Sequence, residues 1–311
     1  MTTLMLLAVS AGLLLLLHFY APAPSGLWTE TLLESLHVPI FGIIALSLFV
    51  ATGLRTDWRP AKRVAFVCVA ATALALLSES AQISGPRDAS FEDLMSDWLG
   101  ASAALLFALA LSGRHLYPLA ARFSVALAGL ALCLIALWPF ISVSIAYVER
   151  NVQQPILVSF DSRIGRVFRH TQHATLHLSH DQVSKKTIGH ITLEEGAWPG
   201  LIFNDIWPDW RDYSTLVIDF GLEGNEPLEI NIRVHDRAHK LGDQPYNDRF
   251  NLSYKLQPGR HTLRVPLEQI RNAPKGRQMD LSQIEGIVVF CSAGHAGRQF
   301  QLVEIRLEYT Q

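Results

Sequence analysis

The feature that most constrains the fold is a change of hydrophobic pattern near Val148. Before this residue, the sequence consists of long apolar runs separated by short polar connections. After it, apolar and polar residues alternate in short segments. Long apolar runs are typical of helices that span a membrane, whereas a period of two is typical of half-buried β-strands. The sequence therefore predicts two domains, an all-α transmembrane bundle over residues 1–150 and an all-β sandwich over residues 155–311.

The apolar half contains five runs that approach the length of a spanning helix, about 20 residues. We expect a bundle of about five helices over Leu4–Tyr20, Val38–Leu54, Val64–Ser78, Trp98–Ser112 and Phe123–Val148. The first run resembles a signal peptide in length, but no Lys or Arg precedes it, so we interpret it as an uncleaved helix. The third and fourth runs are short, and we expect each to extend by one turn into the polar segment between them.

The basic residues predict an orientation. They gather between the second and third runs and between the fourth and fifth, as Arg55, Arg59, Lys62, Arg63, Arg114 and Arg122. Connections rich in Lys and Arg stay on the cytoplasmic side of a membrane. We therefore expect a multi-pass protein of the inner or plasma membrane with a cytoplasmic N-terminus and an extracytoplasmic, periplasmic C-terminal domain.

The segment from Leu77 to Gly100, "LSESAQISGPRDASFEDLMSDWLG", collects ionisable groups between two apolar runs. Residues three or four apart share a helix face, which pairs Glu79 with Gln82 and Asp93 with Asp97. Ionisable groups at membrane depth usually face the protein interior. One interpretation is a polar pocket at the outer mouth of the bundle, formed by His37, Glu79, Gln82, Arg87, Ser90, Asp93 and Asp97. The alternative is a solvated loop in which Ser90 and Asp93 only begin a helix.

The same residues carry a resemblance to the VanZ-like membrane family. The motif joins Glu-x-x-Gln at a helix end, an Arg before a Ser-x-x-Asp turn, and a Gly that follows a further acidic position. It covers roughly Leu27 to Leu111, although the family often has Asn where this sequence has Asp97. The resemblance implies an all-helical protein of the cell envelope, in a family named for a member linked to antibiotic tolerance. It also implies that the pocket is functional.

The second half reads as an antiparallel β-sandwich. In "LEINIRVHD" (Leu228–Asp236) the apolar and polar residues alternate strictly, and "RFNLSYKL" and "VEIRLEY" repeat the pattern. "TLVIDFGL" and "GIVVFCSA" are more uniformly apolar, as strands in the centre of a sheet are. Turns such as "EGNEP" and "QPGR" separate these segments. This half has one of the three cysteines, so it cannot close a disulfide of its own.

Several stretches of this half resemble galactose-binding-like jelly rolls, including carbohydrate-binding modules. They are "DWRDYSTLVIDF", "INIRVHD", "YNDRFN", "LQPGRHTLRVPLEQI" and "RQMDLSQIEGIVVF", over roughly Phe160 to Tyr309. The resemblance implies a jelly-roll sandwich that binds a glycan on a sheet face or at the loops of one edge. Such jelly rolls often hold a structural Ca²⁺, for which Asp161 and Glu304 are the possible oxygen ligands.

Glycan binding needs flat aromatic rings and planar polar side chains, because sugar C–H faces pack on rings while hydroxyls need donors and acceptors. We expect these roles to fall to Trp198, Trp207, Arg233, His235, Asp236, Tyr246, Asp248 and Arg249. The alternative is that the aromatic residues around "WPDWRDY" are ordinary core and that the polar ones are solvated. The histidines between His170 and His239 also permit a transition-metal site, although their strand context does not favour one.

These observations leave two main functions open. In the first, the chain is an envelope protein whose partners are membrane lipid and an envelope glycan or lipid-linked saccharide. In the second, it is a membrane enzyme that uses Glu79, Arg87, Asp93 and Asp97 for acid–base chemistry on a lipid-linked precursor. No nucleophile motif, phosphate loop or zinc signature is present, so the first is favoured. The net charge of −2 does not favour binding of nucleic acid. No charged residue lies in the middle of a predicted span, where an ion or proton transporter would need one, so transport is not favoured either.

Overall fold

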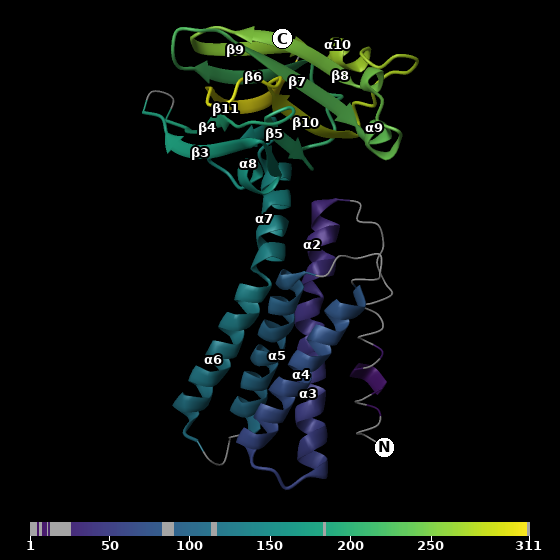
Figure 1. Ribbon diagram of the computed structural model, residues 1–311, viewed down its shortest axis with the longest axis vertical. Coiled ribbons are helices and arrows are strands. Elements are labelled where there is room, and N and C mark those ends of the chain that lie inside the picture. Colours follow the sequence, from purple (N-terminus) through teal and green to yellow (C-terminus); the bar gives the residue numbers. More distant parts are fainter. Residues whose placement is uncertain are drawn as a thin grey trace. The chain divides into compact units, whose positions relative to one another are not determined.

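The structure is a computed structural model, and it describes residues 5, 8–10, 12, 26–82, 90–112, 117–182 and 185–309, without the side chains of residues 81 and 82. The chain divides into two compact units, Met1–Ile141 and Ser142–Gln311 (Figure 1). The first is helical and the second is a β-sandwich, which confirms the predicted order of fold classes. Some of the predicted features lie outside the described residues. They are most of the run Leu4–Tyr20, Arg87 and the side chain of Gln82.

The helical unit is built from apolar helices that pack through α5. The helices are α2 (Leu27–Ser35), α3 (His37–Arg55), α4 (Pro60–Gln82), α5 (Phe91–Ser112), α6 (Leu119–Ala136) and α7 (Trp138–Val152), the last of which continues into the second unit. Within the unit, α5 contacts α3, α4 and α6 (Figure 1). Among the described residues, four helical segments are long and apolar enough to cross a membrane: Leu27–Arg55, Pro60–Ser80, Phe91–Ser112 and Leu119–Ala136.

Two prolines lie at helix boundaries, of which the apolar runs predicted the start of α3 but not the end of α6. The prediction of a single helix over Phe123–Val148 is wrong, because α6 ends at Ala136 and α7 begins at Trp138. Pro139 has no N–H to donate to the carbonyl of Ile135, and its ring crowds that carbonyl, so the helix breaks. Pro39 has the same effect on the carbonyl of Ser35, and α3 therefore begins at His37.

Close packing of α3 on α5 depends on small residues. A Cβ atom added at Gly100 would lie 2.2 Å from the backbone oxygen of Val38, so only glycine fits there. Gly42 faces the backbone oxygen of Gly100, and Ala45 and Ala101 are buried beside it. Close approach through glycine and alanine is typical of helices that associate in lipid. It also brings the first turn of α3, with His37, against the first half of α5.

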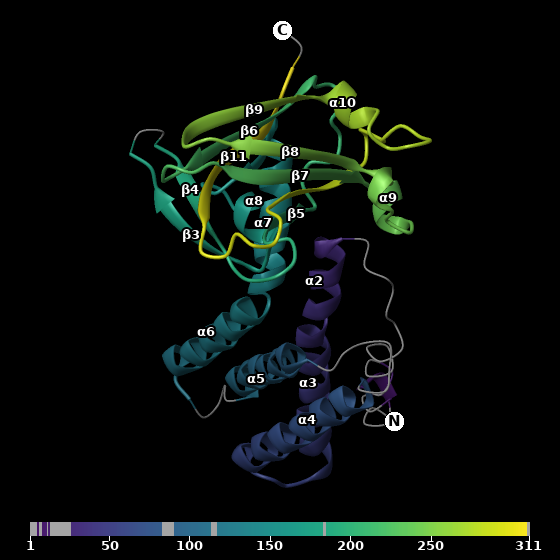
Figure 2. The same ribbon diagram turned by 45° about the horizontal axis from the view of Figure 1, so that its top comes forward.

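The second unit is an antiparallel sandwich of two sheets. Its strands are β1 (Ile156–Ser159), β2 (Arg169–Gln172), β3 (Ala174–His180), β4 (Thr187–Leu193), β5 (Gly200–Asn204), β6 (Thr215–Leu222), β7 (Leu228–Asp236), β8 (Phe250–Leu256), β9 (Gly259–Pro266), β10 (Ile284–Phe290) and β11 (Gln299–Glu308). One sheet has the order β3-β4-β11-β6-β9, with β1 also paired to β11, and the other has the order β2-β5-β10-β7-β8. Short helices α9 (Arg237–Leu241) and α10 (Leu267–Arg271) lie at one end of the sandwich (Figure 2).

The alternation in β7 explains how the sheets stack. Leu228, Ile230, Ile232 and Val234 point into one continuous core between the sheets. The core also contains alternate residues of β10, namely Ile287 and Val289. Since successive side chains of a strand point to opposite faces, the residues between these point outward. The polar positions of β7 therefore form part of an outer sheet surface.

Candidate functional site

The outward surface of sheet β2-β5-β10-β7-β8, here called the five-strand face, is the first candidate site. Strand register aligns its central residues in three rows. The rows are His235–Gly286–Asn204, Arg233–Val288–Ile202 and Asn231–Phe290–Gly200, each running from β7 through β10 to β5. Gly286 to Phe290 spans about 13 Å at about 3.3 Å per residue. The face therefore presents a strip with polar side chains along β7 and apolar ones along β10.

An aromatic platform lies at one end of this strip. Trp198, in the loop before β5, is 57% exposed. Its ring meets Phe290 edge-on, with centroids 5.7 Å apart and an interplanar angle of 84°. The residue has a φ of 58°, in the left-handed region, and Gln172 steadies the loop by donating from Nε2 to the oxygen of Ala197, 3.0 Å away. The loop thus presents a large apolar ring beside the polar row of β7.

Polar atoms along β7 lack protein partners. Asn231 Nδ2, Arg233 Nε and His235 Nδ1 are buried and make no hydrogen bond to any described residue. Most buried polar groups in folded proteins have a partner, often ordered water or a ligand. Burial, followed by the nearby positive charge of Arg233, lowers the pKa of His235 to about 3. The imidazole is therefore neutral at ordinary pH and offers one acceptor and one donor.

Two predicted ligand residues, Asp236 and Asp248, instead form a structural ion pair with Arg277. Arg277 Nη1 lies 2.6 Å from Asp236 Oδ2, and Nη2 lies 2.9 Å from Asp236 Oδ1. Its Nε lies 2.5 Å from Asp248 Oδ1. Asp236 is fully buried and also accepts the backbone N–H groups of His239 and Asp280. Its carboxylate has no room for a ligand, and we place it outside the candidate site.

The remaining predicted residues fall into two groups. Tyr246 is exposed, and the guanidinium of Arg249 lies 5.2 Å from its ring centroid. Arg249 also donates from Nε to Asn251 Oδ1 at 3.1 Å, which holds this pair at the β8 edge of the five-strand face. Trp207, in contrast, donates to the oxygen of Asp209 and packs against the core. Trp210 is fully buried, as expected for an ordinary core residue.

Sequence reasoning missed Phe290, Asn231 and Arg277. Phe290 ends a strand that looks uniformly apolar, and its partner Trp198 is distant in the sequence. A signal was present, because Ile287 and Val289 alternate with Val288 and Phe290, so one of the two sets had to face outward.

The outward surface of the other sheet, here called the six-strand face, differs because its charges are already paired. Arg306 contacts Asp219 and Glu308, Arg264 contacts Glu308, and Thr262 donates to Asp219 at 2.6 Å. At the edge of this sheet, a hollow of about 490 Å³ is lined by His180, His190, Arg260 and others. Arg260 is itself paired with Asp181 at 2.6 Å. The six-strand face is therefore largely satisfied by its own cross-strand contacts.

Of the residues considered for calcium, Glu304 lies on this sheet, in β11, and Asp161 lies in the turn after β1. Glu304 Oε2 is 2.6 Å from Lys186 Nζ, and its Oε1 is 3.4 Å from Arg306 Nη1. Asp161 Oδ1 accepts the N–H of Thr187 at 2.8 Å. Two cations thus already neutralise the Glu304 carboxylate, and Ca²⁺ binding by this pair stays a prediction that would require their displacement.

The second candidate site is a buried polar cluster of His37, Glu79, Asp93 and Asp97, contributed by α3, α4 and α5. His37 Nδ1 lies 2.9 Å from Asp97 Oδ1, and His37 Nε2 lies 3.9 Å from Asp93 Oδ2. Glu79 Oε2 accepts the backbone N–H of Ser90 at 2.9 Å. His37 and Asp97 are fully buried, and Asp93 and Glu79 are 7% and 8% exposed. The structure thus brings together five of the predicted pocket residues, while Arg87 and the Gln82 side chain are not described.

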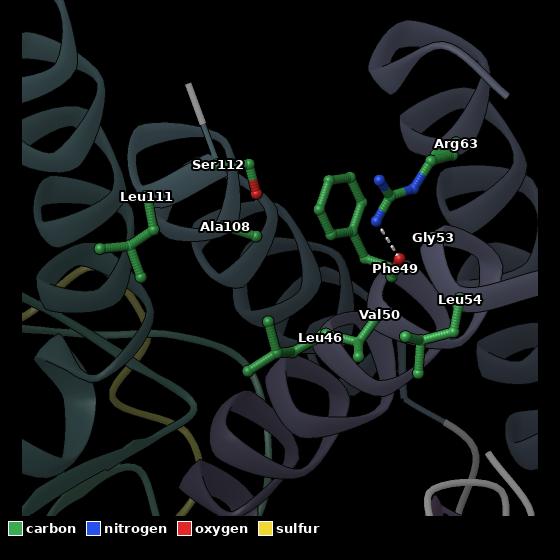
Figure 3. Close-up of a pocket in the computed structure, with 9 residues that line it drawn as sticks. All are labelled: Leu46, Phe49, Val50, Gly53, Leu54, Arg63, Ala108, Leu111 and Ser112. Carbon is green, nitrogen blue, oxygen red and sulfur yellow. Dashed lines mark hydrogen bonds between the residues drawn. The ribbon is translucent and has the colours of Figure 1, made fainter. Parts of the chain in front are cut away.

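A further hollow, of about 360 Å³, lies between α3, α4 and α5 (Figure 3). Its lining is apolar apart from Arg63 and Ser112. Arg63 already donates to the oxygen of Phe49 and stacks over the Phe49 ring at 4.0 Å. Arg63 therefore connects α4 to α3. Because its guanidinium is already bound there, we do not count the hollow as a candidate binding site.

Comparison with known proteins gives a family assignment for neither unit. No protein-family model matches the chain, and no curated protein matches it. The VanZ-like resemblance therefore stays a prediction from the motif.

Solved structures do resemble the sandwich. A family 11 carbohydrate-binding module from Clostridium thermocellum is 14% identical, covering 50% of this chain and 95% of its own, with a TM-score of 0.40. An exo-β-agarase is 14% identical over 51% of this chain and 25% of its own, with a TM-score of 0.41. A xylan-binding domain from Paenibacillus barcinonensis is 15% identical over 50% of this chain and 96% of its own, with a TM-score of 0.33. Similarity at this level carries no functional argument, and the fold rests on the two sheets themselves.

Proposed function

We propose that the β-sandwich binds a glycan on the five-strand face and that the apolar helices hold it at a membrane of the cell envelope. The observation that carries the proposal is the Trp198–Phe290 platform beside the polar row Asn231, Arg233 and His235. An exposed ring offers a flat apolar surface for the C–H face of a sugar. The side chains of Asn231 and Arg233 lie beside it and are only partly buried, so their remaining exposed polar groups can hydrogen-bond to its hydroxyls.

The contrast between the two faces supports this choice. Charges on the six-strand face are paired across strands, as with Arg306 and Asp219. On the five-strand face Asn231 accepts from Ser253 and Asn251 accepts from Arg249, but Arg233 Nε and Asn231 Nδ2 have no partner among the described residues. The neutral His235 adds a group that neither attracts nor repels charge. Because Arg233 and Arg249 are positively charged, the ligand can be a neutral or an acidic glycan.

A binding experiment on the full-length protein in detergent tests the proposal. The protein is screened against an array of envelope polysaccharides, and the best ligand is then titrated with the Trp198→Ala and Arg233→Ala variants. We expect each variant to bind at least tenfold more weakly, which corresponds to about 1.4 kcal/mol. Arg264→Ala, on the six-strand face, is the matched control and should bind as the wild type does. Equal binding by Trp198→Ala and wild type would exclude this face.

The predicted orientation belongs to the same proposal, because a glycan outside the cytoplasm requires an exported sandwich. The connection between α3 and α4 and the adjoining helix ends carry Arg55, Arg59, Lys62 and Arg63, and these basic residues favour a cytoplasmic position for it. Fusion of alkaline phosphatase after Gln311 should give active enzyme, and fusion of green fluorescent protein there should give a dark product. The reverse pattern would place the sandwich in the cytoplasm and remove the glycan proposal.

A second candidate function is acid–base catalysis by the buried polar cluster on a lipid-linked saccharide. The supporting observation is the His37–Asp97 hydrogen bond, which resembles the carboxylate that orients a catalytic imidazole. Asp93 and Glu79 would supply the second acid or base. Turnover of radiolabelled lipid-linked precursors by purified wild type, lost in Asp97→Asn, would support it. Absence of turnover in the wild type for every precursor tested would count against it.

A further inference from the structure

We propose that the buried polar cluster binds a divalent transition-metal ion such as Zn²⁺ or Mn²⁺. Its ligands would be His37 from α3, Glu79 from α4 and Asp97 from α5. One ligand atom from each of these residues lies within 4.8 Å of the other two. Two ligands that each lie about 2.0–2.2 Å from one ion are at most about 4.4 Å apart. The three side chains are therefore close to binding distance before any adjustment.

Burial of the carboxylates calls for a cation. Asp97 is fully buried and Glu79 is 8% exposed. Glu79 Oε1 and Asp97 Oδ2 are buried and make no hydrogen bond to any described residue. No lysine or arginine in the described ranges forms an ion pair with either carboxylate. A buried carboxylate is costly unless it is paired or bound to a metal. Apart from the imidazole of His37, which pairs with Asp97, these two carboxylates have no cationic partner among the described residues, and a metal ion would supply one.

The contacts around the cluster resemble those that orient metal ligands. Asp97 Oδ1 lies 2.9 Å from His37 Nδ1, so an ion bound to both atoms would take the place of the proton that they share. His37 Nε2 lies 3.9 Å from Asp93 Oδ2, which holds the other side of the ring. Glu79 is held through Oε2 by the N–H of Ser90, which leaves Oε1 for the ion. Hydrogen bonds of this kind fix the orientation of metal-bound side chains. Asp93 supplies a further carboxylate next to the imidazole.

The donor set selects the class of ion. Imidazole suits Zn²⁺, Fe²⁺, Ni²⁺ and Cu²⁺, whereas carboxylates also suit Mg²⁺, Ca²⁺ and Mn²⁺. A mixed set of one imidazole and carboxylates favours Zn²⁺ or Mn²⁺ over the purely oxygen-bound Ca²⁺. An ion bound here would cross-link three helices of the bundle, α3, α4 and α5. The inference concerns the helical unit alone and stands even if the sandwich binds no glycan.

The test measures metal on the full-length protein, purified without a histidine tag in detergent. The protein is stripped with a chelator, incubated separately with ZnCl₂ and MnCl₂, desalted, and analysed by mass spectrometry of its metal content. We expect about one equivalent of at least one ion and a higher midpoint of thermal unfolding. Wild type that retains neither ion overturns the proposal. Because this measurement uses wild type alone, its result does not depend on whether any variant folds.

Variants then locate the ion. Glu79→Gln and Asp97→Asn keep the side-chain shape but remove the charge, and each should weaken binding at least a hundredfold. Glu92→Gln, an exposed carboxylate on the same helix as Asp97, is the matched control and should bind normally. Co²⁺ titration of wild type should give visible absorption bands that Glu79→Gln abolishes. Binding that appears only in Arg87→Ala would identify Arg87 as the native counter-charge and would also overturn the proposal.

Discussion

Arg277 is the residue on which the α9 end of the sandwich depends. It lies between two carboxylates and contacts Asp236, which is fully buried, through both terminal nitrogens. Replacing it in Arg277→Met leaves Asp236 as an unpaired buried charge, and we expect a loss of about 3 kcal/mol in the free energy of unfolding. Chemical denaturation followed by near-UV circular dichroism measures it. Arg264→Met removes an exposed ion pair and should cost less than about 1 kcal/mol; equal losses would contradict this account.

The same ion pairs predict a dependence on pH. Burial alone would raise the pKa of Asp236, but hydrogen bonds from Arg277, Asp280 and His239 outweigh it, and the pKa is lowered. The hydrogen bond from Arg277 likewise lowers the pKa of Asp248. Carboxylates with a lowered folded pKa stabilise the fold above the unfolded value, about 3.9, and lose that contribution as pH falls through the folded pKa.

We therefore expect the sandwich to keep its stability above about pH 4 and to lose it progressively below. The Arg277→Met variant lacks the groups that lower these pKa values, so the stability gap between wild type and variant should narrow as the solution is acidified. Denaturation midpoints of both proteins between pH 7 and pH 2 test this. A gap that stays constant over the whole range would show that Arg277 acts through packing alone.

Single residues also show what the sequence can reveal. Trp198, Arg233 and His235 were predicted from residue type and strand alternation, and the structure places them on one face. Asp236 and Asp248 were predicted as glycan ligands on the same grounds, but both pair with Arg277. Arg277 is distant from them in the sequence, and a pairing over such a distance leaves no local pattern. His37 and Asp97 are 60 residues apart, and only the position of each next to an apolar run suggested that they lie on the same side of the bundle.

At the scale of elements, the packing of α3 on α5 depends on Gly100. In Gly100→Ala, the new Cβ would lie 2.2 Å from the oxygen of Val38, and backbone cannot give way as a flexible side chain can. We expect the helices to move apart, at a cost of about 1–3 kcal/mol, and the His37–Asp97 contact next to this point to lengthen. Thermal unfolding in detergent, followed by circular dichroism at 222 nm, measures the change.

Gly42→Ala is the matched control for this prediction. It lies in the same interface, but its added Cβ would be 3.4 Å from the nearest atom, an ordinary contact. Because alanine favours a helix by about 1 kcal/mol over glycine, this variant should be as stable as wild type or slightly more stable. If Gly42→Ala and Gly100→Ala destabilise the protein equally, the interface is looser than the structure shows.

Periodicity predicts the boundaries of some elements and not of others. The alternation of "LEINIRVHD" predicted β7 and its core face correctly, because a period of two has a single meaning on a half-buried sheet. Apolar runs in the helical half carry no such marker. The hydrophobicity of Phe123–Val148 continues across Pro139, and the missing N–H group, rather than composition, ends the preceding helix.

At the scale of the whole molecule, the second half of α7 belongs to the β unit. Tyr147 donates to Asp205 Oδ1 at 2.6 Å, Arg150 donates to the oxygen of Asp205 at 2.8 Å, and Glu149 accepts the N–H of Arg163 at 2.8 Å. A fragment that begins at Ser142 keeps these contacts, whereas one that begins at Pro155 loses them.

We therefore expect both fragments to fold, but the longer one to be more stable by about 1–3 kcal/mol, the range for losing a few hydrogen bonds of which some involve charged groups. Urea denaturation of the two fragments, followed by tryptophan fluorescence, measures the difference. Tyr147→Phe in the longer fragment is the control that removes one of these bonds. Indistinguishable midpoints for the two fragments would show that α7 contributes nothing to the sandwich.

The left-handed backbone of Trp198 has a consequence for any ligand that binds beside it. A residue other than glycine held in this region costs about 1–3 kcal/mol, and folding of the surrounding loop has already met that cost. The loop that carries the indole is held before any ligand binds, by the contact with Phe290 and the hydrogen bond from Gln172 to Ala197. When a glycan binds beside this ring, the protein therefore has little loop ordering left to do, and the entropic cost of association is lower.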